Sequence, residues 1–124
     1  MIRLDTHVVV WLYTGEVERL GDAARMAIDD EAPVISPMVQ LELNYLHEIG
    51  RLTVGGADIV NDLEHRIGLR RSEAELAAMV DTAGALAWTR DPFDRLIVAD
   101  SLVNGATLLT KDRRIHRHTS IAEW

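Results

Sequence analysis

The stretch Arg90-Asp91-Pro92-Phe93-Asp94-Arg95-Leu96-Ile97-Val98-Ala99-Asp100 contains the clearest structural signal in the chain. Asp91 is a favourable helix N-cap, because its carboxylate can accept the free backbone N–H groups of the first turn. Pro92 falls at the first helical position, where its missing N–H costs nothing. Asp94 lies in the same turn, where the helix dipole favours negative charge. The apolar residues that follow predict a buried helix up to Asn104, with two carboxylates at the edge of a core.

The composition sets limits on the class of protein. The 124 residues are enough for a single domain, 1–124, with a core of its own. No apolar run approaches the ~20 residues that cross a bilayer, and we see no signal-peptide pattern, so we expect a cytoplasmic protein without membrane contact. The chain has no cysteine, which excludes disulfides and thiolate metal sites. Its net charge of −7 argues against a broad basic surface for nucleic acid, although it allows a local basic patch.

Short apolar segments alternate with amphipathic ones along the chain. We expect strands at 1–5, 33–36, 106–110 and, more weakly, at 69–72 and 119–124. We expect helices at 6–13, 21–30, 37–49, 57–66, 73–83 and 92–104, with Ser72 as the cap of the fifth, helped by Glu75. Such an alternation predicts an α/β fold in which helices cover both faces of a parallel sheet.

Two acidic residues follow predicted strands. Asp5 ends the first strand, and Asp112 lies two residues beyond Thr110, the end of another strand. In open α/β sheets, ligands bind beyond the carboxyl ends of the strands where the strand order reverses. The two carboxylates would therefore share one crevice if their strands are neighbours. For either residue alone, a helix cap or a turn is the simpler interpretation.

Glu42 is the most informative single position. Apolar residues lie at helical spacings around it, so we expect its carboxylate within the apolar stripe of its helix: Met38, Val39, Tyr45, Leu46 and Ile49. A buried carboxylate must be paired, protonated or bound to a metal, because its unpaired burial is costly. A buried salt bridge to Arg95 is the structural alternative to a functional role.

Asp5, Glu42, Asp94 and Asp112 would repel one another if they met in one crevice without a counter-charge. Oxygen ligands without cysteine favour a hard ion, Mg²⁺ or Mn²⁺. A site of this kind supports phosphoryl chemistry, in which the metal activates water and stabilises the charge that develops at phosphorus. The five histidines show no spacing typical of metal ligands.

Four segments of the chain together resemble the PIN-domain ribonucleases of the VapC toxin type. They are Leu4-Asp5-Thr6-His7, Ser36-Pro37 followed by Glu42-Leu43, Asp91-Pro92-Phe93-Asp94-Arg95-Leu96 followed by Ala99, and Leu109-Thr110-Lys111-Asp112. Each segment alone is weakly specific, but the four occur in order over the whole chain. The resemblance implies a PIN-like three-layer fold, with a central parallel sheet of four or five short strands in the order 3-2-1-4-5.

The same resemblance implies roles for individual residues and for partners. Four acids match the metal-binding and catalytic positions: Asp5, Glu42, Asp94 and Asp112. Three further residues match the flanking hydroxyl positions: Thr6, Ser36 and Thr110. Asp91 and Arg95, beside Asp94, are expected to support the site, although the membership of Asp91 in the site stays open. Proteins of this type are dimeric Mg²⁺- or Mn²⁺-dependent endoribonucleases that cleave single-stranded or looped RNA and are inhibited by a cognate antitoxin. Asp100 departs from the polar amide common in relatives, and its part in the site stays open.

Two other classes of protein compete with this interpretation. A phospho-receiver domain has similar length, acidity and architecture, but it needs an aspartate that ends a central strand. The corresponding region, 52–56, has none, and the paired acids of a receiver's first strand are also missing. A non-catalytic binding module that retains the fold is the second alternative. The presence of all four acids argues against it without excluding it.

Overall fold

The computed structural model describes all of residues 1–124 and contains one parallel five-stranded sheet. Its strands are β1 (Ile2–Leu4), β2 (Val34–Ile35), β3 (Arg70–Arg71), β4 (Thr107–Leu109) and β5 (Ala122–Glu123). Their order is β3-β2-β1-β4-β5, and every neighbouring pair is parallel. The predicted α/β class and the strand order 3-2-1-4-5 are both confirmed. The strands that precede Asp5 and Asp112, β1 and β4, are neighbours at the centre of the sheet.

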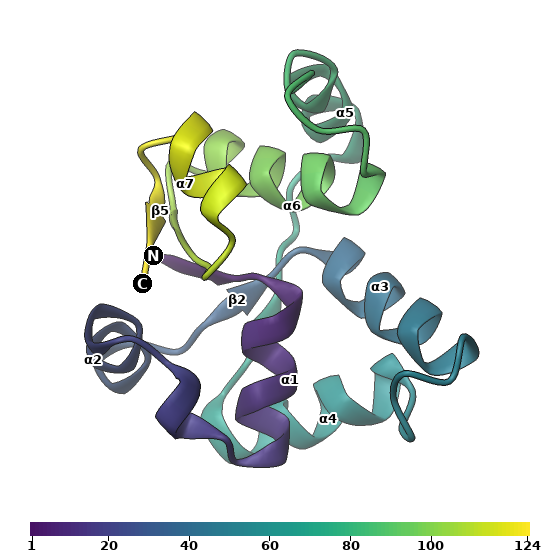
Figure 1. Ribbon diagram of the computed structural model, residues 1–124, viewed down its shortest axis with the longest axis vertical. Helices are drawn as coiled ribbons and strands as arrows, with labels where there is room; N and C mark the ends of the chain where they lie inside the picture. Colours follow the sequence, from purple (N-terminus) through teal and green to yellow (C-terminus); the bar gives the residue numbers. More distant parts are fainter.

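Seven α-helices and one short 3₁₀ helix connect the strands. They are α1 (Thr6–Thr14), η1 (Val17–Arg19), α2 (Asp22–Asp30), α3 (Pro37–Glu48), α4 (Gly56–Ile67), α5 (Leu76–Gly84), α6 (Pro92–Val103) and α7 (Arg113–His118). Figure 1 shows α5 and α6 above the sheet and α1, α2 and α4 below it, while α3 lies to one side. No helix combines the length and apolar character needed to cross a bilayer.

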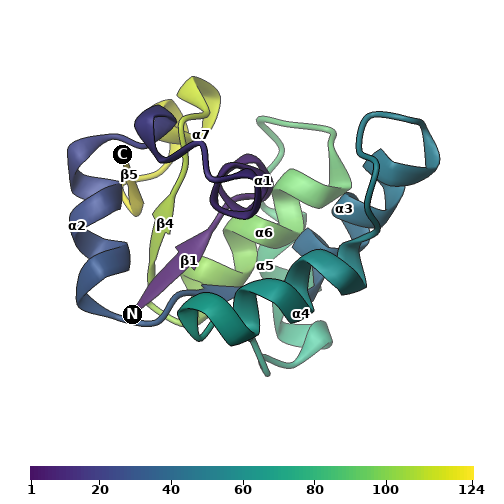
Figure 2. The ribbon, with the colours of Figure 1, turned by 90° about the horizontal axis from the view of Figure 1, so that it is seen from below.

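Local caps place the ends of the helices that border the site. Asp91 accepts hydrogen bonds from the backbone N–H groups of Phe93 and Asp94, so α6 begins as the sequence predicts. Ser36 caps α3 through the N–H of Met38, with a proline in the first turn. Asp5 caps α1, so the chain turns from β1 directly into a helix at this residue. Figure 2 shows α1 end-on beside the tip of β1.

The core is aliphatic and lies between the sheet and the two helical layers. Its fully buried members include Leu4 of β1, Val8 of α1, Leu43 of α3, Ile97 of α6 and Leu109 of β4. A smaller cluster joins α5 to α6. Burying such side chains contributes roughly 1.5–3 kcal/mol each, and this packing fixes the strand ends on which the acidic residues lie.

Two expectations from the sequence need correction. The fifth helix begins at Leu76 rather than Glu73, and Ser72 does not cap it. Instead the Ser72 hydroxyl donates a hydrogen bond to Asp100, 2.7 Å away, and accepts one from the N–H of Ala74. The apolar stripe expected around Glu42 is also only partly buried. Tyr45 and other stripe residues near the end of α3 are about half exposed.

Candidate active site at the carboxyl ends of β1 and β4

The four predicted acids line one crevice at the carboxyl end of the sheet. Asp5 follows β1, Glu42 lies on α3, Asp94 lies in the first turn of α6, and Asp112 follows β4. The crevice has a volume of about 300 Å³. Residues more than 100 positions apart in the chain thus face the same space. The structure therefore brings together the acids that the sequence analysis selected.

Asp5 is the most constrained of the four carboxylates. One of its oxygens accepts a hydrogen bond from the backbone N–H of Thr6 at 2.8 Å, and the other accepts one from the Thr110 hydroxyl at 2.6 Å. The backbone N–H of Asp5 donates to the carbonyl of Leu109 at 3.1 Å. These bonds fix the orientation of a buried carboxylate at the floor of the crevice.

Glu42 is held by Thr6 rather than by an arginine. The Thr6 hydroxyl donates a hydrogen bond to Oε1 of Glu42. The alternative of a buried Glu42–Arg95 salt bridge is wrong, because Nε of Arg95 donates to the carbonyl of Thr89 at 2.8 Å. Burial raises the pKa of Glu42, the Thr6 hydrogen bond opposes this rise, and repulsion from nearby aspartates adds to it.

Asp94 has the most perturbed acidity in the crevice. Burial, and to a smaller extent repulsion from Asp91, Asp5, Asp112 and Glu42, together raise its pKa to about 7. Its carboxylate makes no hydrogen bond within the protein, unlike that of Asp5. Near neutral pH, Asp94 can therefore gain or lose a proton in response to a cation in the crevice.

Asp112 serves both the crevice and a helix end. Its Oδ1 accepts hydrogen bonds from the backbone N–H groups of Arg114 and Ile115 and so caps α7. Its own N–H donates to the Thr110 hydroxyl at 3.0 Å. Because Thr110 also donates to Asp5, one threonine connects two of the four acids.

The predicted supporting residues lie around the crevice, but only one lines it. Thr6 lines the crevice, whereas Ser36, Asp91, Arg95 and Thr110 do not. Ser36 and Asp91 act as helix caps, and Arg95 anchors the segment that precedes α6. Asp91 still affects the site, since its charge contributes to the raised pKa of Asp94.

Asp100 does not join the crevice. It is fully buried on α6, facing Arg3 of β1. Its Oδ1 accepts hydrogen bonds from the Ser72 hydroxyl and the side-chain amide of Asn104. Its Oδ2 lies 3.5 Å from Nε of Arg3. Asp100 is therefore part of a separate buried ion pair between β1 and α6.

The non-acidic part of the crevice was not predicted from the sequence. Arg51, from the loop after α3, is the one Lys or Arg residue that lines the crevice. Apolar residues from α1, α3 and this loop form the remaining wall: Val10, Trp11, Leu46 and Leu52. No local pattern marks Arg51, because only the packing of α3 against α1 brings its loop to the acids.

His7 is a second residue that the sequence analysis did not select. Its Nε2 accepts a hydrogen bond from the backbone N–H of Lys111 at 3.1 Å, which places the proton of the neutral ring on Nδ1. Nδ1 lies 3.6 Å from Oδ2 of Asp5. The ring also packs against Trp11, with 4.9 Å between centroids. His7 therefore joins the β4–α7 loop to the wall of the crevice.

The donor set fits a hard divalent cation. Every acidic donor is a carboxylate oxygen. Burial and the mutual repulsion of these carboxylates both raise the pKa of Asp94, and a bound cation would offset both effects. In the conformation described, no three acidic or histidine side chains converge closely enough to hold a metal ion. Side-chain rotation of Glu42, Asp94 or Asp112 would be needed to bring ligands together, since Asp5 is fixed by its two hydrogen bonds.

Comparisons with known proteins agree with this fold. Residues 2–120 match the family model for the PIN domain. Ribonuclease VapC22 from Mycobacterium tuberculosis is 35% identical, over 94% of this chain and 92% of its own length. A crystal structure of VapBC2 from Rickettsia felis bound to a DNA fragment from their promoter matches with a TM-score of 0.70. That match covers 99% of this chain and 98% of the other at 19% identity, and it supports the fold alone.

Proposed function

The chain belongs to the PIN-domain family, and we propose that it is a VapC-type endoribonuclease, the toxin of a toxin–antitoxin pair, with Mg²⁺ or Mn²⁺ as its cofactor. The observation that carries the proposal is the crevice in which Asp5, Glu42, Asp94 and Asp112 meet. The similarity to ribonuclease VapC22 over nearly the whole chain supports the activity. The receiver-domain alternative is wrong, since the PIN match spans residues 2–120.

In phosphodiester hydrolysis, the acids of the crevice would bind the metal and the two threonines orient these acids. A bound Mg²⁺ or Mn²⁺ would supply an activated water and would stabilise negative charge at phosphorus. Asp94, Glu42 and Asp112 would hold the ion together with Asp5. Thr6 and Thr110 orient the carboxylates of Glu42 and Asp5 through hydrogen bonds. We propose single-stranded or looped RNA as the substrate, because its phosphates are accessible without a helical groove.

A cleavage assay with purified protein tests the activity. We expect RNA cleavage with Mg²⁺ or Mn²⁺ that stops in EDTA, and a loss of at least ~100-fold in Asp94→Asn, because the substitution removes a metal ligand. Asp29→Asn is the matched control, since Asp29 is an exposed acid of α2 outside the crevice. Cleavage by Asp94→Asn at the wild-type rate in EDTA would refute the metal mechanism. No cleavage of any RNA would favour a non-catalytic binding module.

We propose an antitoxin that places a cation in the acidic crevice. Four carboxylates face a single arginine there, so a partner's Lys or Arg would gain charge-assisted hydrogen bonds and would compete with the metal. Co-purification with the protein encoded by the adjacent small gene should give a complex with weaker Mn²⁺ binding than the free chain. Equal Mn²⁺ affinity in both would show that the partner blocks RNA elsewhere.

We propose a homodimer that covers apolar residues of α3 and α5. Leu41, Tyr45 and Ile49 recur every four residues on α3, and Leu76 and Val80 do so on α5. All five are about half exposed or more, and they make up five of the ten large apolar residues that the protein exposes. Light scattering should give the mass of two chains, and Tyr45→Glu should give that of one. A monomeric wild type would contradict the proposal.

A further inference from the structure

The largest cavity of the protein lies away from the acidic crevice and shares no residue with it. It has a volume of about 670 Å³ and lies over β1, β2 and β3, near the start of α3. Three of its nine lining residues are arginines: Arg3, Arg70 and Arg71. Only two of the lining residues are hydrophobic. A pocket of this size that is mostly polar suits a charged ligand rather than an apolar one.

Arg3 is the unusual member of this cavity, because it is only 5% exposed and yet poorly satisfied. Its Nε and Nη1 make no hydrogen bond in the protein. Asp100 lies at ion-pair distance from Nε, 3.5 Å, but its Oδ2 also lacks a hydrogen-bond partner. Buried N–H groups without partners are rare in proteins and costly. Nε and Nη1 are sealed beside Asp100, whereas Nη2 also has no hydrogen-bond partner but is not sealed, so Nη2 is the donor that a small oxyanion in the cavity could use.

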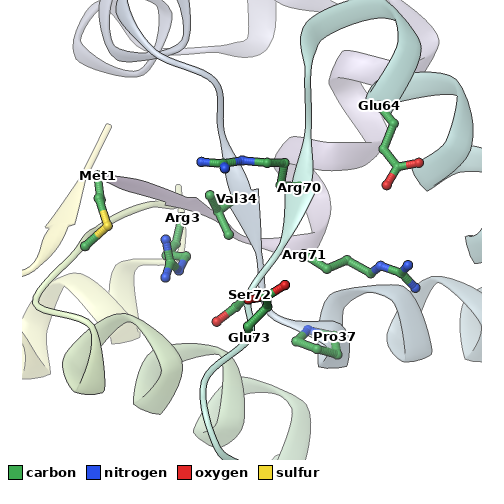
Figure 3. Close-up of a pocket in the computed structure, with 9 residues that line it drawn as sticks. All are labelled: Met1, Arg3, Val34, Pro37, Glu64, Arg70, Arg71, Ser72 and Glu73. Carbon is green, nitrogen blue, oxygen red and sulfur yellow. The ribbon is translucent and has the colours of Figure 1, made fainter.

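Arg70 is placed beside Arg3 by the register of the sheet. Arg3 of β1 pairs with Val34 of β2, and Val34 pairs with Arg70 of β3. In-register residues of parallel strands lie on the same face, so the two arginines flank Val34 with about 10 Å between their Cα atoms. In Figure 3 the Arg70 side chain extends across Val34 toward the β1 side. The Arg70 guanidinium makes no hydrogen bond or ion pair within the protein.

Arg71 differs from Arg70 although the two are adjacent in β3. Its side chain extends the other way, toward α3, where Nη1 lies 3.4 Å from the side-chain oxygen of Gln40. The strand alternation thus separates two exposed arginines of equal charge. Arg71 is at the rim, whereas Arg70 and Arg3 face the same floor.

We propose that this cavity is a binding site for a phosphate group, held between the guanidinium groups of Arg3 and Arg70. The guanidinium fork of Arg70 matches two oxygens of a phosphate, and the accessible Nη2 of Arg3 can donate to a third oxygen of the same tetrahedral anion. No aromatic residue lines the cavity, so a nucleobase has no surface on which to stack. The ligand is therefore inorganic phosphate or a small phosphate ester, and a base attached to it adds no affinity.

The negative groups at the cavity limit its affinity. Glu64 and Glu73 lie at the rim and are exposed, and Asp100 already faces Arg3 from below. These charges offset part of the attraction, so we expect binding in the millimolar range rather than the micromolar range. The guanidinium of Arg70, which has no internal partner, supplies most of the net attraction.

Phosphate titration of the full chain, followed by ³¹P NMR or calorimetry in EDTA, tests the proposal. The chelator removes any metal through which the crevice could hold phosphate. We expect saturable binding that Arg70→Ala weakens by at least ~10-fold and Arg70→Lys weakens less, because Lys retains the charge but loses the fork. Arg71→Ala is the matched control and should change affinity by less than about twofold. Adenosine monophosphate should bind no more tightly than methyl phosphate.

Three results would overturn the proposal. Binding that does not saturate would show that the cavity holds only water. Equal losses in Arg70→Ala and Arg71→Ala would show diffuse attraction to a basic edge rather than a site. Adenosine monophosphate that binds much more tightly than methyl phosphate would place the ligand on a surface that stacks bases, elsewhere on the molecule. Because Arg70 is exposed, its variants test the site without disturbing the buried pair of Arg3.

Discussion

β1 and α6 face each other with charged side chains at two places, and the charges combine differently at the two places. At the carboxyl end of β1, Asp5 lies in the same crevice as Asp94 of α6, so like charges meet. Two residues earlier on β1, Arg3 faces Asp100, which lies six residues later on α6, so opposite charges meet. In the crevice, burial and then repulsion from neighbouring carboxylates raise the pKa of Asp94 to about 7, while Arg3 and Asp100 are almost fully buried. The same two elements thus carry a reactive end and a structural end.

This contrast follows from what each end is packed against. The carboxyl end of the sheet opens into a crevice, where a cation or a proton can compensate excess negative charge. At Arg3 and Asp100 the exposed fractions of the side chains are 6% and 0%, so compensation must come mainly from the protein itself. Equal substitutions at Asp94 and Asp100 should therefore have opposite effects on stability.

The largest effect is expected for Asp100→Asn. The substitution leaves the guanidinium of Arg3 buried without a counter-charge, which should lower the free energy of unfolding by about 3–5 kcal/mol. Urea unfolding followed by circular dichroism measures the change. The double variant Arg3→Met/Asp100→Asn is the control, because it removes both charges while the Asn side-chain oxygen can still accept from Ser72 and Asn104, and it should recover most of the loss. A single variant as stable as wild type would show that water or an anion already compensates Arg3.

The sequence predicted the part of the site that depends on local rules. The Asp91-Pro92 cap predicts the start of α6 at Pro92, as observed. The alternation of strands and helices predicts that Asp5 and Asp112 follow strand ends. Because ligands bind at such strand ends, the sharing of one crevice followed from topology. The resemblance of short motifs to PIN-domain ribonucleases supplied the strand order, and the structure confirms it.

The sequence failed where a distant partner decides. The pattern at Ser72 is typical of a helix cap, but the Ser72 hydroxyl donates its hydrogen bond to Asp100. The helix begins four residues later, at Leu76. Arg95 is a plausible ion-pair partner for Glu42 from the sequence, but its Nε–H donates to the backbone carbonyl of Thr89. The buried pair was detectable in principle, because Arg3 interrupts a central strand and Asp100 interrupts an apolar helix.

Helical periodicity also could not separate buried apolar residues from exposed ones. The apolar residues around Glu42 satisfy helical spacing, but only Val39 and Leu43 of α3 are buried. Tyr45 and Ile49 lie toward the solvent side of the same helix. Hydrophobic spacing predicts an apolar helix face, and it does not predict how much of that face the chain itself buries.

The second prediction concerns Asp94→Asn, which removes one charge from the crevice at nearly constant shape. Because the folded pKa of Asp94 is about 7 and its ordinary value is 3.8, the folded protein binds more protons than the unfolded chain between these values. Wild-type stability should therefore be greatest near pH 4 with respect to this group and should fall as the pH rises to about 7. After discounting for partial exposure, we expect a loss of roughly 1–2 kcal/mol.

Asp94→Asn should lack this loss, and in EDTA at pH 7–8 it should be as stable as wild type or more stable by up to ~1–2 kcal/mol. Urea unfolding of both proteins at several pH values between 4 and 8 gives the comparison. Asp29→Asn, which changes an exposed acid, should follow the wild-type pH dependence. A variant clearly less stable than wild type at pH 7 would mean that Asp94 is structural, as Asp100 is.

The smallest expected effect is the stabilisation by Mn²⁺, which distinguishes metal binding in the crevice from protonation of Asp94. If Mn²⁺ binds at the crevice, it should stabilise the wild type by mass action, by about 1 kcal/mol when its free concentration is roughly five times its Kd. It should barely affect Asp94→Asn, because that variant lacks an anionic ligand, and it should stabilise Asp100→Asn by the same increment as wild type, since Asp100 is outside the crevice. Thermal unfolding of the three proteins with and without Mn²⁺, after chelation of bound metal, measures these shifts. Equal shifts in wild type and Asp94→Asn would place the ion elsewhere, and the like-charged end of β1 and α6 would then lose its proposed role as the metal site.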